Sequence, residues 1–371
     1  MLLSIEKDKL SRLLHLAHSV VERKNTMPIL ANIKLTADKK KLSFAATNLE
    51  VSLTGEVDAD IDTKGSTTVD AKVFYDIIKE LPNERIVLKL VDDKRLDITC
   101  GKSNFKINTT SSDEFPNLAG VKLENPAVID ASMLYEMFDK TAFAVSSDES
   151  RLNINGVLVE FLKTKNSSNI RFVATDGHRL AMIERNIDGI NEFKSVIVPR
   201  KAIVEIKKIL EGNDGAAKVE ISESFITIAS KEVTIGVRLV DGQFPDYMQV
   251  VPKEHNTKFD VKKDEFLSAV RRVSLMTADK NKAVKFSIKG STMTISSSSA
   301  EFGEAVDSIE IEKQGNDVEV GFSARYVAEL LSAISEDQMV TVKLNGNLSP
   351  GIFNPKDMET FTCVVMPMRF E

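Results

Sequence analysis

The densest group of side chains that could do chemistry lies in the segment Ala174-Thr-Asp-Gly-His-Arg-Leu180. Asp176, His178 and Arg179 crowd one short stretch between two segments with strand-like composition. An enzyme could use His178 as a general base that Asp176 orients. A hairpin turn is the alternative, in which Asp and Gly shape the backbone while His and Arg line a surface. Because no nucleophile or metal partner is identifiable, the pattern favours a recognition surface over a hydrolase.

Other sequence motifs for catalysis or cofactor binding are incomplete or absent. Gly101-Lys-Ser103 looks like the end of a phosphate-binding loop, but that motif requires glycine five residues before Gly101, where Leu96 stands. The sequence also lacks G-x-G-x-x-G, H-E-x-x-H and G-x-S-x-G. Its four histidines are scattered and its two cysteines form no CxxC. We therefore expect no catalysis, no cofactor, no metal site and no disulfide.

The charge balance limits how the chain could meet nucleic acid. Its net charge of −6, from 49 Lys plus Arg and 55 Asp plus Glu, argues against a surface that coats nucleic acid everywhere, but allows a local basic face. The absence of Trp and the four Tyr argue against stacking on single-stranded bases. No segment approaches the roughly 20 apolar residues of a membrane helix, so we expect a cytoplasmic protein without membrane contact.

A faint internal repeat organises the chain. Segments that begin at Ile5, Ile129 and Val261 share an apolar strand end, a polar stretch and apolar residues at helical spacing. Each is followed by a second stretch with helical character, and these lie at residues 69–81, 198–210 and 322–334. Between the helices the pattern changes to period two, which is typical of antiparallel strands.

The repeat predicts an α+β protein of three similar domains, because 371 residues are too many for one compact core. A single large α/β enzyme would instead need parallel strands that alternate singly with helices. Phe-Pro pairs followed by polar stretches mark linkers near residues 117–126 and 246–257. The predicted domains are residues 1–125, 126–253 and 254–371.

Four motifs, in order along the chain, resemble the bacterial sliding clamps, the beta subunits of DNA polymerase III. They are Ala174-Thr-Asp-Gly-His-Arg-Leu-Ala181, Val196-Ile-Val-Pro-Arg-Lys201, Leu239-Val-Asp-Gly-Gln-Phe-Pro-Asp-Tyr247 and Val365-Met-Pro-Met-Arg-Phe370. The resemblance covers essentially the whole chain. It implies a DNA clamp fold in which two copies join head to tail as a ring, with antiparallel sheets outside and paired helices lining the hole. Such a homodimer encircles double-stranded DNA without reading its sequence and keeps the polymerase processive.

The resemblance also implies a pocket for peptides of the polymerase III alpha subunit, the clamp-loader delta subunit, and other polymerases and repair proteins. The residues that match the family's deeper apolar subsite are Ile154, Thr175, Gly177, His178, Arg179, Leu180, Pro245, Val250, Val364 and Met366. Those that match the neighbouring subsite are Ser323, Tyr326, Pro367, Met368 and Arg369. The chain departs from the family at Phe370, where Leu is usual, and at the added Glu371, so its peptide preference can differ. Met366 and Met368 could alternatively be the core of an edge strand.

The same resemblance implies contacts to DNA phosphates and a ring interface. By motif position the DNA contacts fall on Arg23, Lys24, Lys72, Arg200 and Lys201, for each of which a solvated charged face is the alternative. The interface residues are Phe105 and Ile107 in the first domain and Leu275 and Met276 in the third. Lys102 and Lys106 would then face Glu301, Glu304 and Asp307.

Three functional classes therefore remain open. A DNA clamp is favoured, since motif order and repeat agree with it. A hydrolase that uses Asp176 and His178 would show turnover, and a repeat-built protein-interaction scaffold would be indifferent to DNA.

Overall fold

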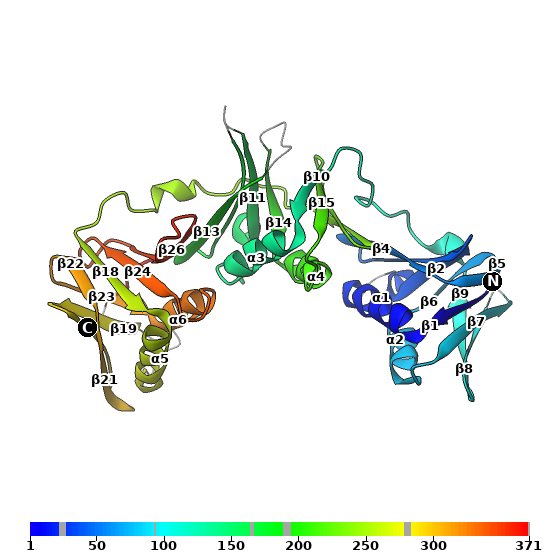
Figure 1. Cartoon of the computed structure of the whole chain (residues 1–371), viewed down its shortest axis with the longest axis horizontal. Helices are drawn as coiled ribbons and strands as arrows, with labels where there is room; N and C mark the ends of the chain where they lie inside the picture. The colour runs from blue at the N-terminus through cyan, green and yellow to red at the C-terminus, as the bar shows by residue number, and fades with distance from the viewer. Residues whose placement is uncertain (22–26, 93, 164–166, 188–193, 278–282, 370–371) are drawn as a thin grey trace. The chain divides into compact units, whose positions relative to one another are not determined.

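The computed structural model describes residues 1–21, 27–92, 94–163, 167–187, 194–277 and 283–369. Figure 1 shows the course of the chain, which folds into two compact units; the first contains Met1–Tyr135 and Lys201–Leu239. The second contains Glu136–Arg200 and Val240–Glu371. Strands from the middle third of the chain contribute to both units, so the domain limits 1–125, 126–253 and 254–371 stay a prediction.

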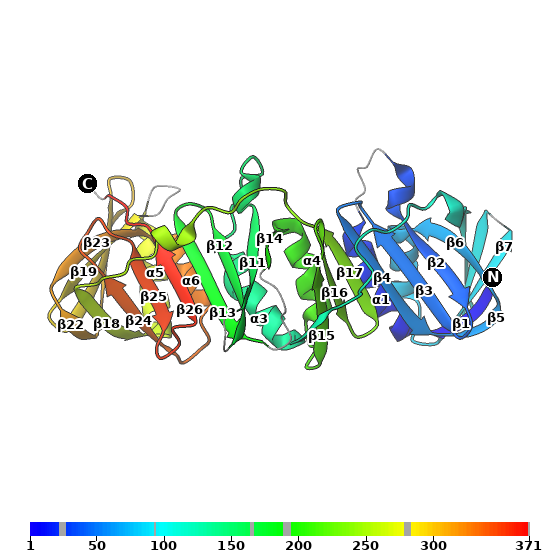
Figure 2. The same cartoon turned by 90° about the horizontal axis from the view of Figure 1, so that it is seen from above.

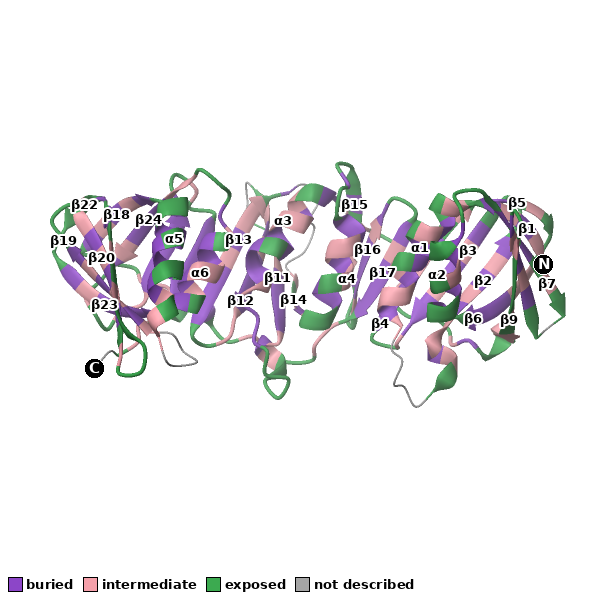
Figure 3. Cartoon of the chain, turned by 90° about the horizontal axis from the view of Figure 1, so that it is seen from below, coloured by how far each residue is buried: buried purple, intermediate pink, exposed green. Residues whose placement is uncertain are grey.

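Helices α1 (Lys7–Val20) and α2 (Ala71–Glu80) contact each other in the first unit. Each buries one stripe of side chains, such as Leu10 and Leu14 of α1 and Phe74 of α2, as the helical spacing requires (Figure 3). The side chain of Asp70 caps α2 by accepting a 2.8 Å hydrogen bond from the Val73 N–H. α1 also contacts the strands β3 and β4 described next, so this pair covers one face of a sheet.

The sheet of the first unit joins strands from the first and middle thirds of the chain (Figure 2). β4 pairs antiparallel with β17, where Leu53 lies opposite Ile235 and Thr54 opposite Thr234. Leu53 and Ile235 are buried, which places the two threonines on the opposite face. In spatial order the strands are β10 (Ala127–Asp130), β15 (Ala216–Ile221), β16 (Phe225–Ser230), β17 (Val233–Arg238), β4 (Val51–Asp58), β3 (Lys41–Thr47), β2 (Asn32–Asp38), β6 (Gly65–Asp70), β9 (Ser103–Thr110), β8 (Arg95–Cys100), β7 (Arg85–Asp92), β1 (Leu2–Glu6) and β5 (Asp60–Thr63).

A second sheet, in the other unit, joins strands of the middle and last thirds by the same kind of pairing. β13 pairs antiparallel with β26, and Leu180 lies opposite Val364. In spatial order its strands are β14 (Lys194–Pro199), β11 (Gly156–Lys163), β12 (Ser168–Thr175), β13 (Arg179–Asn186), β26 (Phe361–Val365), β25 (Gly351–Pro355), β24 (Met339–Leu344), β18 (Thr257–Lys262) and β22 (Glu312–Gly315).

A smaller sheet completes the second unit. Its strands, in spatial order, are β21 (Gly303–Glu310), β20 (Thr292–Ser299), β19 (Ala283–Lys289) and β23 (Val318–Ser323). Helices α5 (Lys263–Val273) and α6 (Ala324–Ser332) contact each other. Edge-to-face contacts link the rings of Phe266, Phe286, Phe322 and Phe353 at centroid distances of 6.0, 5.7 and 5.7 Å.

The predicted helix pairs are confirmed. The first helix of each repeat is α1, α3 (Ala131–Ala142) or α5, and the second is α2, α4 (Arg200–Leu210) or α6. The sheets are antiparallel at every pairing between described strands, as the period-two segments predicted. Within the described residues, no helix is long and apolar enough to cross a membrane.

Candidate functional site

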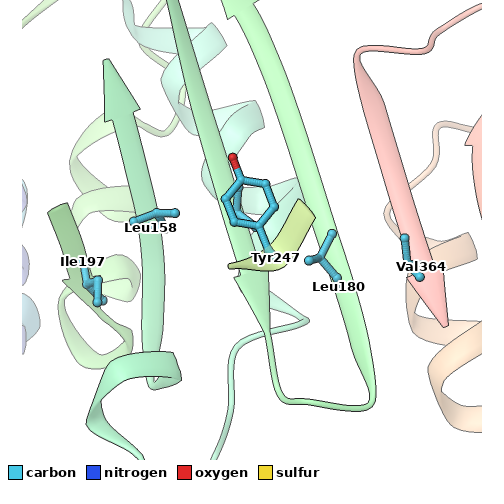
Figure 4. Packing of buried hydrophobic residues seen from close by; sticks show 6 residues of the cluster. Leu158, Leu180, Ile197, Tyr247 and Val364 are labelled. Carbon is cyan, nitrogen blue, oxygen red and sulfur yellow. The ribbon is translucent and has the colours of Figure 1, made fainter. Parts of the chain in front are cut away.

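The floor of the candidate peptide pocket is an apolar cluster on one face of the second sheet (Figure 4). Leu180 of β13 and Val364 of β26 face the same side and are almost fully buried, at 2% and 1% exposure. Leu158, Val173 and Ile197 continue this surface, and Tyr247 packs on it. Two predicted site residues from distant parts of the sequence therefore form one floor.

Tyr247 fixes the segment that borders this floor. Its hydroxyl donates a 2.6 Å hydrogen bond to Glu160 Oε2 and accepts one of 2.9 Å from Arg171 Nη1. Burial, followed by the hydrogen bond to Glu160, raises the pKa of Tyr247 to about 12. Tyr247 begins a short 3-10 helix, Tyr247–Gln249, and on either side of it Pro245 and Val250 stay exposed. The tyrosine thus anchors the flanking predicted residues to the sheet.

A tight turn between β12 and β13 forms the next side of the site. The Asp176 carboxylate accepts hydrogen bonds from the backbone N–H groups of His178 (2.9 Å) and Arg179 (3.1 Å). Gly177 has φ +90°, a conformation that side chains rarely adopt. Thr175 Oγ1 closes the turn by donating to the Arg179 carbonyl at 2.7 Å. Asp176 and Gly177 therefore shape the backbone, as the hairpin interpretation expected.

The C-terminal segment, residues 366–369, links this turn to the last domain. The Met366 N–H donates to the His178 carbonyl at 2.9 Å, and the Met368 N–H donates to the Gly321 carbonyl at 2.8 Å. The side chain of Met366 is 38% exposed, whereas Val365 before it is buried. Pro367 and Met368 are half-buried, and Arg369 is exposed. The segment is therefore held by its backbone while it presents side chains to solvent.

Arg179 lies on the opposite face of the sheet from Leu180, because successive strand residues alternate. Its guanidinium binds Glu329 Oε2 at 2.5 Å and Asp176 Oδ2 at 3.1 Å, and it lies 4.5 Å from the centre of the Tyr326 ring. The ring of Tyr326 also stacks on His178, with centroids 6.3 Å apart. Arg179 is only 8% exposed, so it supports the turn and α6 and offers little charge to a ligand.

Two other predicted site residues are also buried and stabilise the structure around the site. Ile154 is 1% exposed in the 3-10 helix Leu152–Ile154, and Ser323 is 2% exposed. The hydroxyl of Ser323 accepts a hydrogen bond from the Tyr326 N–H at 3.4 Å and caps α6. Sequence reasoning did not include Tyr247 or the exposed Met248 among the site residues, although Tyr247 ends one of the four motifs and Met248 follows it.

Comparison with protein-family models gives matches to a single family along almost the whole chain. Models of the DNA polymerase III beta subunit match its N-terminal domain at residues 1–119, its central domain at 128–246 and its C-terminal domain at 248–369. The beta sliding clamp of Caulobacter vibrioides NA1000 is 35% identical over 341 residues, which cover 91% of this chain and 92% of that protein. That of Pseudomonas aeruginosa PAO1 is 31% identical over 372 residues and 99% of each chain. This chain belongs to the DNA polymerase III beta subunit family.

Solved structures show the same architecture. The Caulobacter crescentus beta sliding clamp has a TM-score of 0.93 at 33% identity, and the Bacillus subtilis clamp one of 0.94 at 28% identity, each covering 100% of both chains. As a sliding clamp, the protein is a non-catalytic processivity factor of the bacterial replicative polymerase, which confirms the favoured prediction. The hydrolase and scaffold alternatives are not supported. The Asp176 carboxylate accepts a hydrogen bond from the backbone N–H of His178 and binds the side chain of Arg179. Among the described residues, no group of three or more His, Cys, Asp and Glu side chains could hold a metal ion.

The predicted DNA-contacting residues of the clamp lie on the surfaces of its helices where the structure describes them. Lys72 is exposed on α2 and forms a 3.8 Å ion pair with Asp76 one turn later. Arg200 and Lys201 are exposed in the first turn of α4. Arg23 and Lys24 lie outside the described residues, as do Phe370 and Glu371.

The predicted interface residues of the clamp lie on β9, which is paired on one side along part of its length, and beside the edge strand β21. Phe105 is 39% exposed on β9, which among the described residues pairs with β8 along its length and with β6 only near Thr109 and Thr110. Ile107 is half-buried on the same strand. Leu275, which is 73% exposed, and Met276 lie in the 3-10 helix Ser274–Met276, which contacts β21.

β21 carries interface candidates that sequence reasoning missed. It pairs only with β20 among the described strands, and Val306 on it is 68% exposed. Phe302, just before the strand, is 53% exposed. Asp307 accepts a 2.7 Å hydrogen bond from Arg272 of its own chain, so part of its charge is already neutralised. The sequence did contain a signal for Val306, because this apolar residue lies between Glu304 and Asp307, two acidic residues that were already predicted to lie at the interface.

Proposed function

We propose that two copies of this chain close head to tail into a ring around duplex DNA. The part of strand β9 that β6 leaves unpaired in one copy lies beside β21 of the other, together with Leu275 and Met276. Exposed apolar side chains on both strands support this arrangement, because edge strands with free backbone groups and apolar residues readily pair. Lys102 and Lys106 on the first surface complement Glu301 and Glu304 on the other. Two such identical interfaces close a ring.

The apolar surface around Leu180 and Val364 binds short peptides of replication and repair proteins. The observation that carries this assignment is a preformed apolar floor whose neighbours Met366 and Val250 remain 38% and 42% exposed. Leu or Phe side chains of an extended peptide fit such a surface, and flexible Met adapts to several partners. The Bartonella birtlesii clamp was solved bound to griselimycin, which we expect this chain to bind as well.

The partners are the polymerase III alpha subunit, the clamp-loader delta subunit, and other polymerases and repair proteins that carry clamp-binding peptides. DNA passes through the ring and meets basic side chains without base readout. The residues assigned to this contact are Arg23, Lys24, Lys72, Arg200 and Lys201. Because bacterial DNA is replicated in the cytoplasm, we place the ring there.

Threading can be tested on nicked circular DNA. The full chain is loaded with a bacterial clamp loader and ATP, and the protein retained on DNA is measured before and after the circle is cut. We expect retention on the circle and release from the linear product, since an open end lets a ring slide off. Retention on linear DNA, or no loading with a competent loader, would contradict the ring.

A further inference from the structure

A second groove lies on the first sheet, away from the peptide pocket. It encloses about 690 Å³ and lies against the Thr54 and Thr234 pair of β4 and β17. We call it the threonine groove. Its floor is made of small side chains on the face opposite Leu53, and its wall is the chain segment 115–118. The floor residues are Thr36, Ser43, Ala45, Thr54 and Thr234.

The threonine groove repeats the construction of the peptide pocket. In both places an antiparallel strand pair joins parts of the chain that are far apart in sequence, β4 with β17 and β13 with β26. In both places a Phe-Pro pair opens the bordering segment, Phe115-Pro116 here and Phe244-Pro245 there. The central cross-strand pair differs, with two threonines in place of Leu180 and Val364. The framework is thus the same, but the floor suits a polar ligand.

The wall of the groove is held in place before any ligand binds. Thr227 Oγ1 donates a 2.7 Å hydrogen bond to the Gly120 carbonyl. A Cβ on Gly236 would lie 1.9 Å from that carbonyl oxygen, so only glycine lets the segment approach β17 this closely. Phe115 is 7% exposed and secures the other end of the segment. A fixed wall reduces the entropy that a ligand would lose on binding.

Lysines at the rim determine the charge that the groove accepts. Lys41 is neutralised by a 2.9 Å ion pair with Glu56. Lys34 has no ion-pair partner among the described residues, and Lys231 donates to the Gly212 carbonyl at 3.3 Å. Glu232 is the opposing carboxylate in the lining. With Lys41 and Glu56 cancelled, the lining holds two further lysines and one glutamate, so the groove favours an anion.

We propose that the threonine groove binds an extended acidic peptide segment of a partner protein. Lys34 and Lys231 pair with its carboxylates, and the hydroxyl groups of the floor hydrogen-bond to its polar groups. Thr54 and Thr234 lie at the centre of the floor, where the other pocket has Leu180 and Val364, so the ligand differs from the peptides assigned to that pocket. The proposal goes beyond the proposed function, since it assigns a second ligand site, which lies within the first unit.

The test uses a fluorescein-labelled octapeptide of alternating Glu and Ser that carries a photoreactive benzophenone. Its affinity for the full chain is measured by fluorescence anisotropy at low salt. We expect Lys34→Glu and Lys231→Glu each to weaken binding by about 10-fold, because charge reversal replaces attraction with repulsion. Lys218→Glu, on β15 of the same sheet but outside the groove, is the matched control and should change little. Cross-links should map to β2, β3, β4 and the start of β17.

Other outcomes would overturn the proposal. Equal affinity in the reversed and wild-type chains would exclude the groove, provided that thermal unfolding shows each variant folded. Loss of binding in Met366→Glu would place the acidic peptide in the other pocket, without affecting the assignment of that pocket. Equal binding of a Lys-Ser octapeptide, or of inorganic polyphosphate at matched charge, would exclude an acidic peptide as the specific ligand.

Discussion

Met366 joins the two halves of the proposed peptide pocket, since His178 holds its backbone while its side chain stays exposed. In Met366→Glu, a carboxylate would stand where an apolar peptide side chain must lose its water, which is costly. We expect at least about a 10-fold loss of affinity for a Leu- and Phe-containing clamp-binding peptide, or about 1.4 kcal/mol. Isothermal titration would measure this loss. Leu348→Glu, at a position 75% exposed, is the control, and an equal loss there would contradict the assignment.

The contribution of Tyr247 to stability should depend on pH in the alkaline range. Its pKa is raised from 10.0 to about 12 in the folded chain, so its stabilising contribution is complete below pH 10 and is lost as pH rises from 10 to 12. At neutral pH, Tyr247→Phe should cost about 1–2 kcal/mol, because it removes the hydroxyl group that hydrogen-bonds to Glu160 and Arg171. The difference in unfolding free energy between the two chains should then shrink above pH 10 by about 1.4 kcal/mol per pH unit. A constant difference in denaturant titrations from pH 8 to 11 would refute this.

The sequence predicted some of these residue roles and could not have predicted others. Period two alone places Arg179 and Leu180 on opposite faces of a strand, so their different roles were accessible from the sequence, although the resemblance assigned both to one subsite. The partners of Tyr247 were not accessible, because Glu160 and Arg171 are 87 and 76 residues away along the chain. Such side-chain contacts depend on strand register, which local patterns do not specify.

At the level of elements, β21 should decide whether the chain dimerises. Val306→Asp places a charge on a strand face that the proposed interface would bury, and an unpaired buried charge is strongly unfavourable. We expect the variant to sediment as a monomer at concentrations where the wild type is a dimer. Val128→Asp provides a control on another edge strand, β10, at a position 60% exposed. A dimer of unchanged stability in Val306→Asp would place the interface elsewhere.

The residue that caps helix α6 can be tested for two different roles, stabilising the fold or contacting the peptide directly. Ser323 matched the family's peptide subsite, but the structure makes it the buried N-cap of α6. Ser323→Ala should therefore destabilise the chain by about 1 kcal/mol, as the loss of a helix cap does. Peptide affinity should fall less than twofold, because Tyr326 keeps its place on Arg179. A large loss of affinity without loss of stability would instead show direct contact with the peptide.

The elements themselves were largely predictable, and their assembly was not. Helical spacing in the repeats predicted α1 to α6, because each helix buries one stripe against a sheet. The pairings of β4 with β17 and β13 with β26 connect strands about 180 residues apart along the chain. No local pattern encodes such pairings, although they create both grooves. The resemblance to clamps, carried by short motifs, supplied what periodicity could not.

For the whole molecule, topology and charge make separate contributions to DNA binding. A net charge of −6 disfavours tight electrostatic binding, so a ring must hold DNA mainly by enclosing it. Salt should then leave the loaded clamp on circular DNA, because screening weakens the phosphate contacts and the charge pairs of the interface but not the apolar burial that keeps the ring closed. We expect a less than twofold change in retention between about 0.1 and 0.5 M NaCl on nicked circles.

The basic residues on the helices should matter at a different step. Lys72→Glu and Lys201→Glu remove attraction that guides DNA into the open ring, so loading rates should fall with a weaker dependence on salt. Retention after closure should match the wild type, since the enclosure is unchanged. Loading rates would come from stopped-flow fluorescence and retention from gel filtration of the DNA complex. Lys218→Glu, on a sheet strand, should alter neither quantity. If Lys72→Glu shortened retention on closed circles, charge and not enclosure would hold the protein on DNA.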